Sequence, residues 1–143
     1  MKRAVVDASV ALKWFLPDEE GSDSALKLLQ RFVSGRLELL APSLLEYEVV
    51  NSLVIAGRRG RIGEEFVERA IESFFDLGIP IWDLKGLHRE TFMIATKCRC
   101  SGYDAAYVVL AQKEGIPLIT VDVRLATAAG TVYKNIHGFD ATL

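Results

Sequence analysis

The chain has 143 residues, of which 50% are hydrophobic and 25% charged, and its formal net charge is −2. This length and this balance predict one domain over residues 1–143 and exclude a disordered or fibrous protein. No window approaches the ~20 apolar residues of a membrane helix, and the first residues lack a signal-peptide run. We therefore expect a cytoplasmic protein with no membrane partner.

Short apolar runs alternate with helical patterns along the chain. In chain order the expected elements are a strand (3–7), a helix (22–35), a strand (37–41), two helices (42–57 and 63–78), a strand (79–83), two helices (88–98 and 103–115) and two strands (116–122 and 131–136). Near-continuous apolar strands alternating with helices are typical of a parallel sheet covered on both faces. The fold class predicted is α/β, a three-layer α/β/α sandwich with a mostly parallel sheet of about five strands.

Two aspartates stand at the ends of predicted buried strands. Asp7 follows the run AVV, and Asp122 follows LIT. Sites in parallel sheets lie beyond the carboxyl ends of the strands, so these two carboxylates are candidates for one crevice. Each is also a candidate N-cap of the helix that follows it, and Asp104 lies in a first helical turn, where an acid favours the helix dipole. Both interpretations stay open for each residue.

The helix predicted over 42–57 carries two glutamates with different surroundings. Ser43 and Glu46 match the capping box S-x-x-E, which gives Glu46 a local role at the start of the helix. Glu48 has no such role, and Asn51 adds a second polar group on the same helix face. No lysine or arginine lies within a turn of Glu48, so a metal ion is a candidate partner for a carboxylate on a covered face.

Asp7, Glu48, Asp104 and Asp122 together form a candidate metal site. Grouped carboxylates repel one another and are tolerated mainly around a cation. A set of oxygen ligands without His or Cys suits Mg²⁺ or Mn²⁺ rather than zinc. Such acid-held ions recur in enzymes that hydrolyse phosphodiesters. Without these four acids, 15 acidic residues remain against 17 Lys and Arg, so the net charge does not exclude a nucleic-acid partner.

Three segments, in order, resemble the PIN-domain family and, more narrowly, its VapC-like toxin ribonucleases. They are VVDASVALKWF, APSLLEYEVVNSL and YDAAYVVLAQKEGIPLITVDVRL. In the second segment the glutamate three residues before Asn51 matches the family's ligand, in agreement with the capping argument. The resemblance implies a metal site of Asp7, Glu48, Asp104 and Asp122, with Ser9, Asn51 and Thr120 in support.

The resemblance also implies an activity and partners. Members are Mg²⁺- or Mn²⁺-dependent endoribonucleases that dimerise and are neutralised by a small cognate antitoxin, which also binds operator DNA. The apolar stripes of the helices at 43–57 and 63–76 are the segments we expect to supply a dimer or antitoxin surface.

Two other classes of protein remain in competition with the ribonuclease. A phospho-accepting signalling domain also places an aspartate at a strand end. Such a domain normally has paired acids near that aspartate and a lysine at the end of the last strand, and in this sequence Lys134 matches the lysine only loosely. A non-catalytic PIN-like binding module is the second alternative, in which the acidic cluster serves as a docking surface. Acyl-phosphate labelling separates the signalling domain from the ribonuclease, and metal-dependent cleavage of RNA by the purified chain separates the binding module from it.

Overall fold

The structure is a computed structural model that describes residues 2–16 and 20–139. Its elements are β1 (Lys2–Val6), α1 (Ala8–Ala11), the 3₁₀ helix η1 (Leu12–Trp14), α2 (Ser22–Val33), β2 (Leu37–Pro42), α3 (Leu44–Arg58), α4 (Glu64–Asp76), β3 (Ile81–Trp82), α5 (His88–Cys98), α6 (Gly102–Glu114), β4 (Leu118–Ile119), α7 (Val123–Ala129) and β5 (Ile136–His137). Among the described helices, none is long and apolar enough to cross a membrane.

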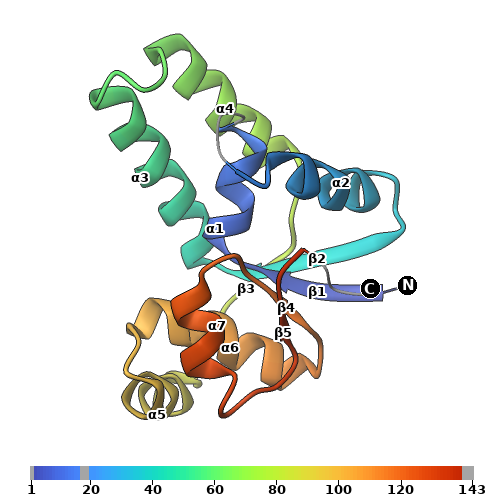
Figure 1. The fold of residues 1–143 in the computed structure, drawn as a ribbon, viewed down its shortest axis with the longest axis vertical. Coiled ribbons are helices and arrows are strands. Elements are labelled where there is room, and N and C mark those ends of the chain that lie inside the picture. The colour runs from blue at the N-terminus through green and yellow to red at the C-terminus, as the bar shows by residue number, and fades with distance from the viewer. Residues whose placement is uncertain (1, 17–19, 140–143) are drawn as a thin grey trace.

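The five strands form one sheet in the order β3-β2-β1-β4-β5, and every neighbouring pair is parallel. Figure 1 shows α1 to α4 on one face of the sheet and α5 to α7 on the other. The predicted α/β/α sandwich is therefore confirmed. Because all the strands run in one direction, their carboxyl ends meet at the same edge, where β1 leads into α1 and β4 leads towards α7.

The hydrophobic core lies on both sides of β1. Ala4, Val5 and Val6 are fully buried, as expected for a central parallel strand covered on both faces. Helix α6 is buried over 105–111, nearly all the way round, because it packs against both β1 and β2. The body of α6 is therefore anchored against the sheet, and Asp104 directly precedes this buried stretch.

Most expected elements are present, but some bounds differ. Helix α5 coincides with the predicted span 88–98, and Gly115 ends α6 in the left-handed conformation (φ +64°) that glycine favours. The strands predicted over 79–83 and 116–122 pair over only two residues each. Asp7 and Asp122 accordingly lie just beyond their strands, where each is the N-cap of a short helix.

The prediction of a strand over 131–136 is wrong for most of its length. The amides of Val132 and Tyr133 both donate to the carbonyl of Ala129, so this segment turns out of α7. The Tyr133 hydroxyl lies 2.6 Å from the Ile116 carbonyl oxygen, to which it donates. This long-range anchor draws the segment over the end of α6, and β5 begins only at Ile136.

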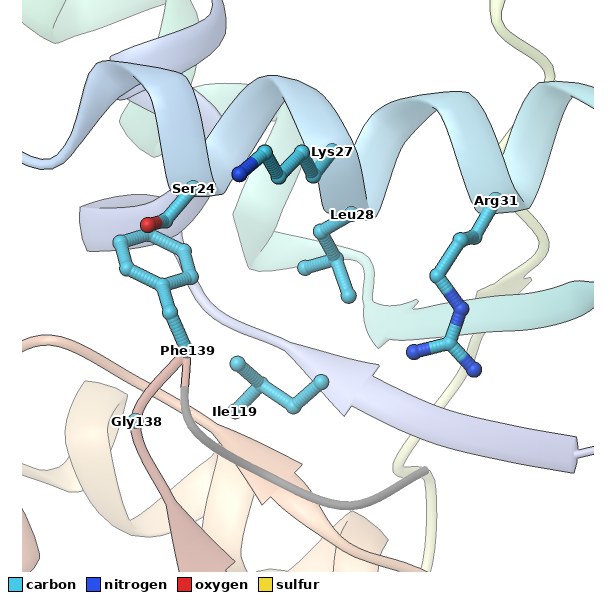
Figure 2. A pocket seen from close by; sticks show the side chains of 7 residues that line it. All are labelled: Ser24, Lys27, Leu28, Arg31, Ile119, Gly138 and Phe139. Carbon is cyan, nitrogen blue, oxygen red and sulfur yellow. The ribbon is translucent and has the colours of Figure 1, made fainter.

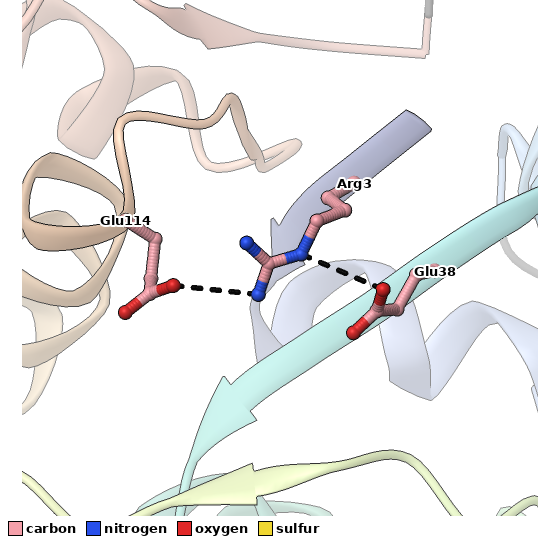
Figure 3. A network of polar contacts seen from close by, with 3 residues as sticks. All are labelled: Arg3, Glu38 and Glu114. Atoms are coloured by element: carbon pink, nitrogen blue, oxygen red, sulfur yellow. Dashed lines mark hydrogen bonds and ion pairs between the residues drawn. The ribbon is translucent and has the colours of Figure 1, made fainter. Parts of the chain in front are cut away.

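An ion-pair network ties the amino end of β1 to its neighbours. The Arg3 Nε lies 3.5 Å from Glu38 Oε2 on β2, and Arg3 Nη2 lies 3.3 Å from Glu114 Oε2 at the end of α6 (Figure 3). Arg3 lies near the start of β1, at the end of the strand opposite the carboxyl edge of the sheet. The network therefore supports the sheet and stands apart from the candidate site.

Candidate functional site

Asp7 is the most buried of the four predicted site acids, with 5% of its surface exposed. Its Oδ1 accepts hydrogen bonds from the Ser9 hydroxyl at 2.6 Å and from the Val10 amide at 3.2 Å. Its Oδ2 accepts one from the Thr120 hydroxyl. The bond from Val10 makes Asp7 the N-cap of α1, so the capping role left open by the sequence is real. It does not account for the contacts of Oδ2.

Ser9 and Thr120 join the ends of β1 and β4. The Ser9 hydroxyl accepts from the Val121 amide at 3.1 Å, and the Thr120 hydroxyl accepts from the Asp122 amide at 3.1 Å. The same two hydroxyls also hold Asp7, so the backbone before Asp122 is fixed relative to the Asp7 carboxylate. A supporting role for Ser9 and Thr120, which the family resemblance implies, stays a prediction, and these hydrogen bonds are consistent with it.

The surroundings of Asp7 make its negative charge unfavourable. Burial raises its pKa from 3.8 to about 6, and the charge of Asp122 acts in the same direction. The bonds from Ser9, Thr120 and Val10 oppose this rise but do not cancel it. A cation beside Asp7 would remove the penalty, which is the electrostatic condition of a metal site.

Glu48 has a partner that the sequence did not reveal. The buried Tyr107 hydroxyl donates to Glu48 Oε1 at 2.7 Å, across 59 positions of sequence. Burial raises the Glu48 pKa, the Tyr107 bond opposes the rise, and the charge of Asp104 adds to it. The available signal was a hydroxyl-bearing residue three positions after Asp104, on the same side of an otherwise apolar helix.

Asp104 and Asp122 complete the row of acids. Asp104 lies in the first turn of α6, where its amide donates to the Ser101 hydroxyl at 3.0 Å. Burial raises the Asp104 pKa, the charge of Asp122 raises it further, and Arg124 lowers it. Asp122 Oδ1 accepts from the Leu125 amide at 3.2 Å and so caps α7. Both aspartates combine a role at a helix start with a place among the acids.

Each of the four acids affects the pKa of at least one other, or has its own pKa raised by one. Asp122 raises the pKa of Asp7 and of Asp104, and Asp104 raises the pKa of Glu48. They line more than one hollow, however. Asp104 and Asp122 line a pocket of about 340 Å³, and Glu48 lines a second pocket of about 360 Å³. The acids therefore lie near one another along the carboxyl edge, with Asp104 and Asp122 in one hollow and Glu48 in another.

Two predictions on α3 need correction. Ser43 precedes the helix, but its side chain makes no capping hydrogen bond, so the predicted capping box with Glu46 does not form. Ser43 itself has helical backbone angles (φ −56°, ψ −26°), which differ from the extended conformation of an ordinary N-cap. Asn51 is exposed beside Glu48 in the second pocket, and its side chain makes no hydrogen bond to another described residue. The face that carries Glu48 is thus only partly covered.

The oxygen atoms around Asp7 and Glu48 suit a hard cation. A carboxylate oxygen has two lone pairs. Asp7 Oδ2 accepts a single bond within the described chain, and Glu48 Oε2 accepts none there, so both retain acceptor capacity. Over residues 2–16 and 20–139, no three His, Cys, Asp or Glu side chains stand in a ready-made metal cluster. The donor chemistry fits Mg²⁺ or Mn²⁺, and assembly of the ligands requires the acids to approach one another.

A further pocket lies apart from the acids. Figure 2 shows it between α2 and the end of β5, with a volume of about 270 Å³ and a lining of Ser24, Lys27, Leu28, Arg31, Ile119, Gly138 and Phe139. None of the four acids lines it. It therefore does not belong to the candidate site.

Comparisons with known proteins show the family to which the chain belongs. Residues 4–130 match the PIN domain family. The chain is 32% identical over 126 residues to ribonuclease VapC3 of Pyrobaculum aerophilum. This alignment covers 87% of the present chain and 92% of VapC3. The chain is 31% identical to ribonuclease VapC9 of Mycobacterium tuberculosis over 122 residues, or 85% of this chain and 87% of that one. This chain therefore belongs to the PIN-domain family.

A solved structure supports the same fold. The crystal structure of PAE2754 from Pyrobaculum aerophilum superposes with a TM-score of 0.69, covering 96% of this chain and 91% of that one at 22% sequence identity. At this identity the likeness concerns the fold alone.

Proposed function

We propose that this protein is a metal-dependent endoribonuclease and the toxin of a VapBC-type toxin–antitoxin pair. The observation that carries the proposal is Asp7, a buried carboxylate at the carboxyl end of the central strand whose charge is penalised by burial and by Asp122. The similarity to proteins named VapC ribonucleases supports RNA as the substrate.

Asp7, Glu48 and Asp104 would hold Mg²⁺ or Mn²⁺, with Asp122 beside them. When bound, such an ion would neutralise charge that develops on the phosphate and would lower the pKa of an attacking water. Other residues of the chain hold individual acids in position before the ion binds. Ser9 and Thr120 fix the Asp7 carboxylate.

Glu48 is held by a different contact, because the Tyr107 hydroxyl donates to Glu48 Oε1. This bond leaves Glu48 Oε2 without a hydrogen bond within the described chain. The Tyr107 bond fixes one oxygen of Glu48 before any cation binds, which reduces the cost of ordering that side chain when the ligands assemble.

The burial of Asp7 disfavours the phospho-accepting alternative. A phospho-acceptor must present a carboxylate oxygen to an incoming phosphoryl group. Asp7 is 5% exposed, and both of its oxygens accept hydrogen bonds. The non-catalytic binding module remains the competing class, and the cleavage assay below separates it from a ribonuclease.

We propose a homodimer and a cognate antitoxin as protein partners. Helices α3 and α4 extend together away from the sheet in Figure 1 and expose aromatic side chains, among them Tyr47, Phe66 and Phe75. Sedimentation at increasing protein concentration tests the dimer, and a monomer at every concentration would refute it.

The free thiols of Cys98 and Cys100 fit a reducing cytoplasm.

The test of function compares two glutamates that lie two residues apart on α3. Purified wild-type protein should cleave RNA when Mg²⁺ or Mn²⁺ is present and stop when the metal is chelated. Glu48→Gln should lose cleavage by orders of magnitude, since metal-held charge contributes several kcal/mol and each ~1.4 kcal/mol is tenfold in rate.

Glu46→Gln is the matched control, because Glu46 lines a different hollow against α4. Equal cleavage by both variants would refute the assignment of Glu48. No cleavage by the wild-type protein with either metal, on any RNA offered, would favour the binding module.

A further inference from the structure

Two arginines share a pocket with two of the site acids. The pocket of about 340 Å³ lies where α5 ends and α6 and α7 begin, and Arg99 and Arg124 line it together with Asp104 and Asp122. Both arginines are exposed. One hollow beside the candidate metal site therefore contains charges of both signs.

Neither guanidinium forms an ion pair within the described chain, although the charge of Arg124 lowers the pKa of Asp104. Arg99 and Arg124 make no ion pair or side-chain hydrogen bond there, although two carboxylates line the same pocket. Arg3 shows the contrast, since two glutamates bind it at the opposite end of the sheet (Figure 3). A guanidinium that stands near acids without pairing retains all its donors for an anion.

The backbone of Arg99 gives an independent indication. Arg99 has φ +53° and is the single non-glycine residue with positive φ among those that the structure describes. It ends α5 in the left-handed conformation, in which glycine is favoured over residues with a Cβ. A side chain retained where glycine would be more stable points to a function for that side chain.

We propose that Arg99 and Arg124 form a subsite that binds a phosphate of RNA next to the one that is cleaved. This inference rests on the proposed ribonuclease function. Arginine binds phosphate through paired N–H donors and remains charged at all physiological pH values. With the scissile phosphate at the acids, the following or preceding phosphate of the same strand enters the part of the pocket that the arginines line.

The experiment measures RNA binding apart from cleavage. A short single-stranded RNA is titrated against Asp7→Asn protein in the presence of Mg²⁺, with Arg124→Gln or Arg99→Gln added to that background. Each added change should weaken binding at least about tenfold, the loss expected for one charge-assisted contact. Each should also lower the slope of log K against log salt by about 1.

Two controls make the result specific. Arg69→Gln removes an exposed charge from α4, on the opposite face of the sheet, and should leave affinity nearly unchanged. Replacing one phosphate of the RNA at a time by an uncharged methylphosphonate should identify a position at which Arg124→Gln no longer weakens binding. A loss of the same size with every modified RNA would overturn the subsite.

Arg99→Gly separates a binding role from a structural one. Because glycine favours the positive φ of this position, the variant should have a higher Tm than the wild type while binding RNA more weakly. Unchanged affinity in the Arg99 and Arg124 variants, with cleavage by the wild type intact, would overturn the subsite alone. A wild-type protein that neither binds nor cleaves RNA would overturn both the subsite and the proposed function.

Discussion

Asp7→Asn tests the electrostatic account of the site through protein stability. Asparagine has nearly the same shape and also serves as an N-cap, so the bond from the Val10 amide to Oδ1 can persist. The charge is lost, and so is the acceptor for the Thr120 hydroxyl. The variant therefore removes a penalised charge at the expense of one hydrogen bond.

The magnitude follows from the pKa of Asp7, which is raised from 3.8 to about 6. Folding favours the protonated form of Asp7, so the contribution of Asp7 to wild-type stability is most favourable below pH 3.8 and is lost as the pH rises through 6. The shift corresponds to about 3 kcal/mol at neutral pH. Loss of the Thr120 bond costs about 1 kcal/mol. The variant should thus be about 1 kcal/mol less stable at pH 3.5 and about 2 kcal/mol more stable at pH 7.

Urea unfolding of both proteins in EDTA, at pH values from 3.5 to 8, measures this difference. Glu48 and Asp104 also have raised pKa values, but they contribute to both proteins and largely cancel in the comparison. A difference in unfolding free energy that is the same at pH 3.5 and pH 7 would refute the reasoning. With Mn²⁺ added, the wild type should gain stability by mass action and the variant should gain little.

Three further substitutions test the supporting contacts. Tyr107→Phe removes the hydrogen bond to Glu48, so it should reduce stability by about 1 kcal/mol and weaken Mn²⁺ binding measured by calorimetry. It should also raise the pKa of Glu48, which moves the acid limb of the pH–rate profile to higher pH. Thr120→Val should raise the pKa of Asp7 further and destabilise the protein by about 1–3 kcal/mol in urea unfolding, because the Asp7 and Asp122 contacts of that hydroxyl are lost. Arg3→Ala should change stability by no more than about 1 kcal/mol, since the pairs are partly exposed, and it should leave RNA cleavage intact.

The layers of the fold could be predicted because parallel strands covered on both faces are nearly continuous apolar runs. The runs before Asp7 and Asp122 show this pattern, so the carboxyl edge of the sheet was recognisable in advance. The strand expected over 131–136 failed because Tyr133 bonds to backbone carbonyls far away in sequence. Periodicity contains no information about a contact of that kind.

The positions of the candidate acids were predictable from the sequence, whereas their contacts with other elements were not. The acids stand out by position, but the bond from Tyr107 to Glu48 spans two helices that only the folded chain brings together. The capping box at Ser43 shows the converse, since a local motif was present and the helix began without using it. Arg99 was not recognisable, because its function is suggested by a backbone angle rather than by its neighbours in sequence.

The central claim is that the acids at the carboxyl edge hold a divalent cation. Anomalous diffraction from crystals grown with Mn²⁺ locates such an ion directly. The account predicts one strong peak within coordination distance of carboxylate oxygens of Asp7 and Glu48, with Asp104 turned towards it and Tyr107 still bonded to Glu48. A Mn²⁺ peak elsewhere, or none at this edge in protein that cleaves RNA with Mn²⁺, would contradict it.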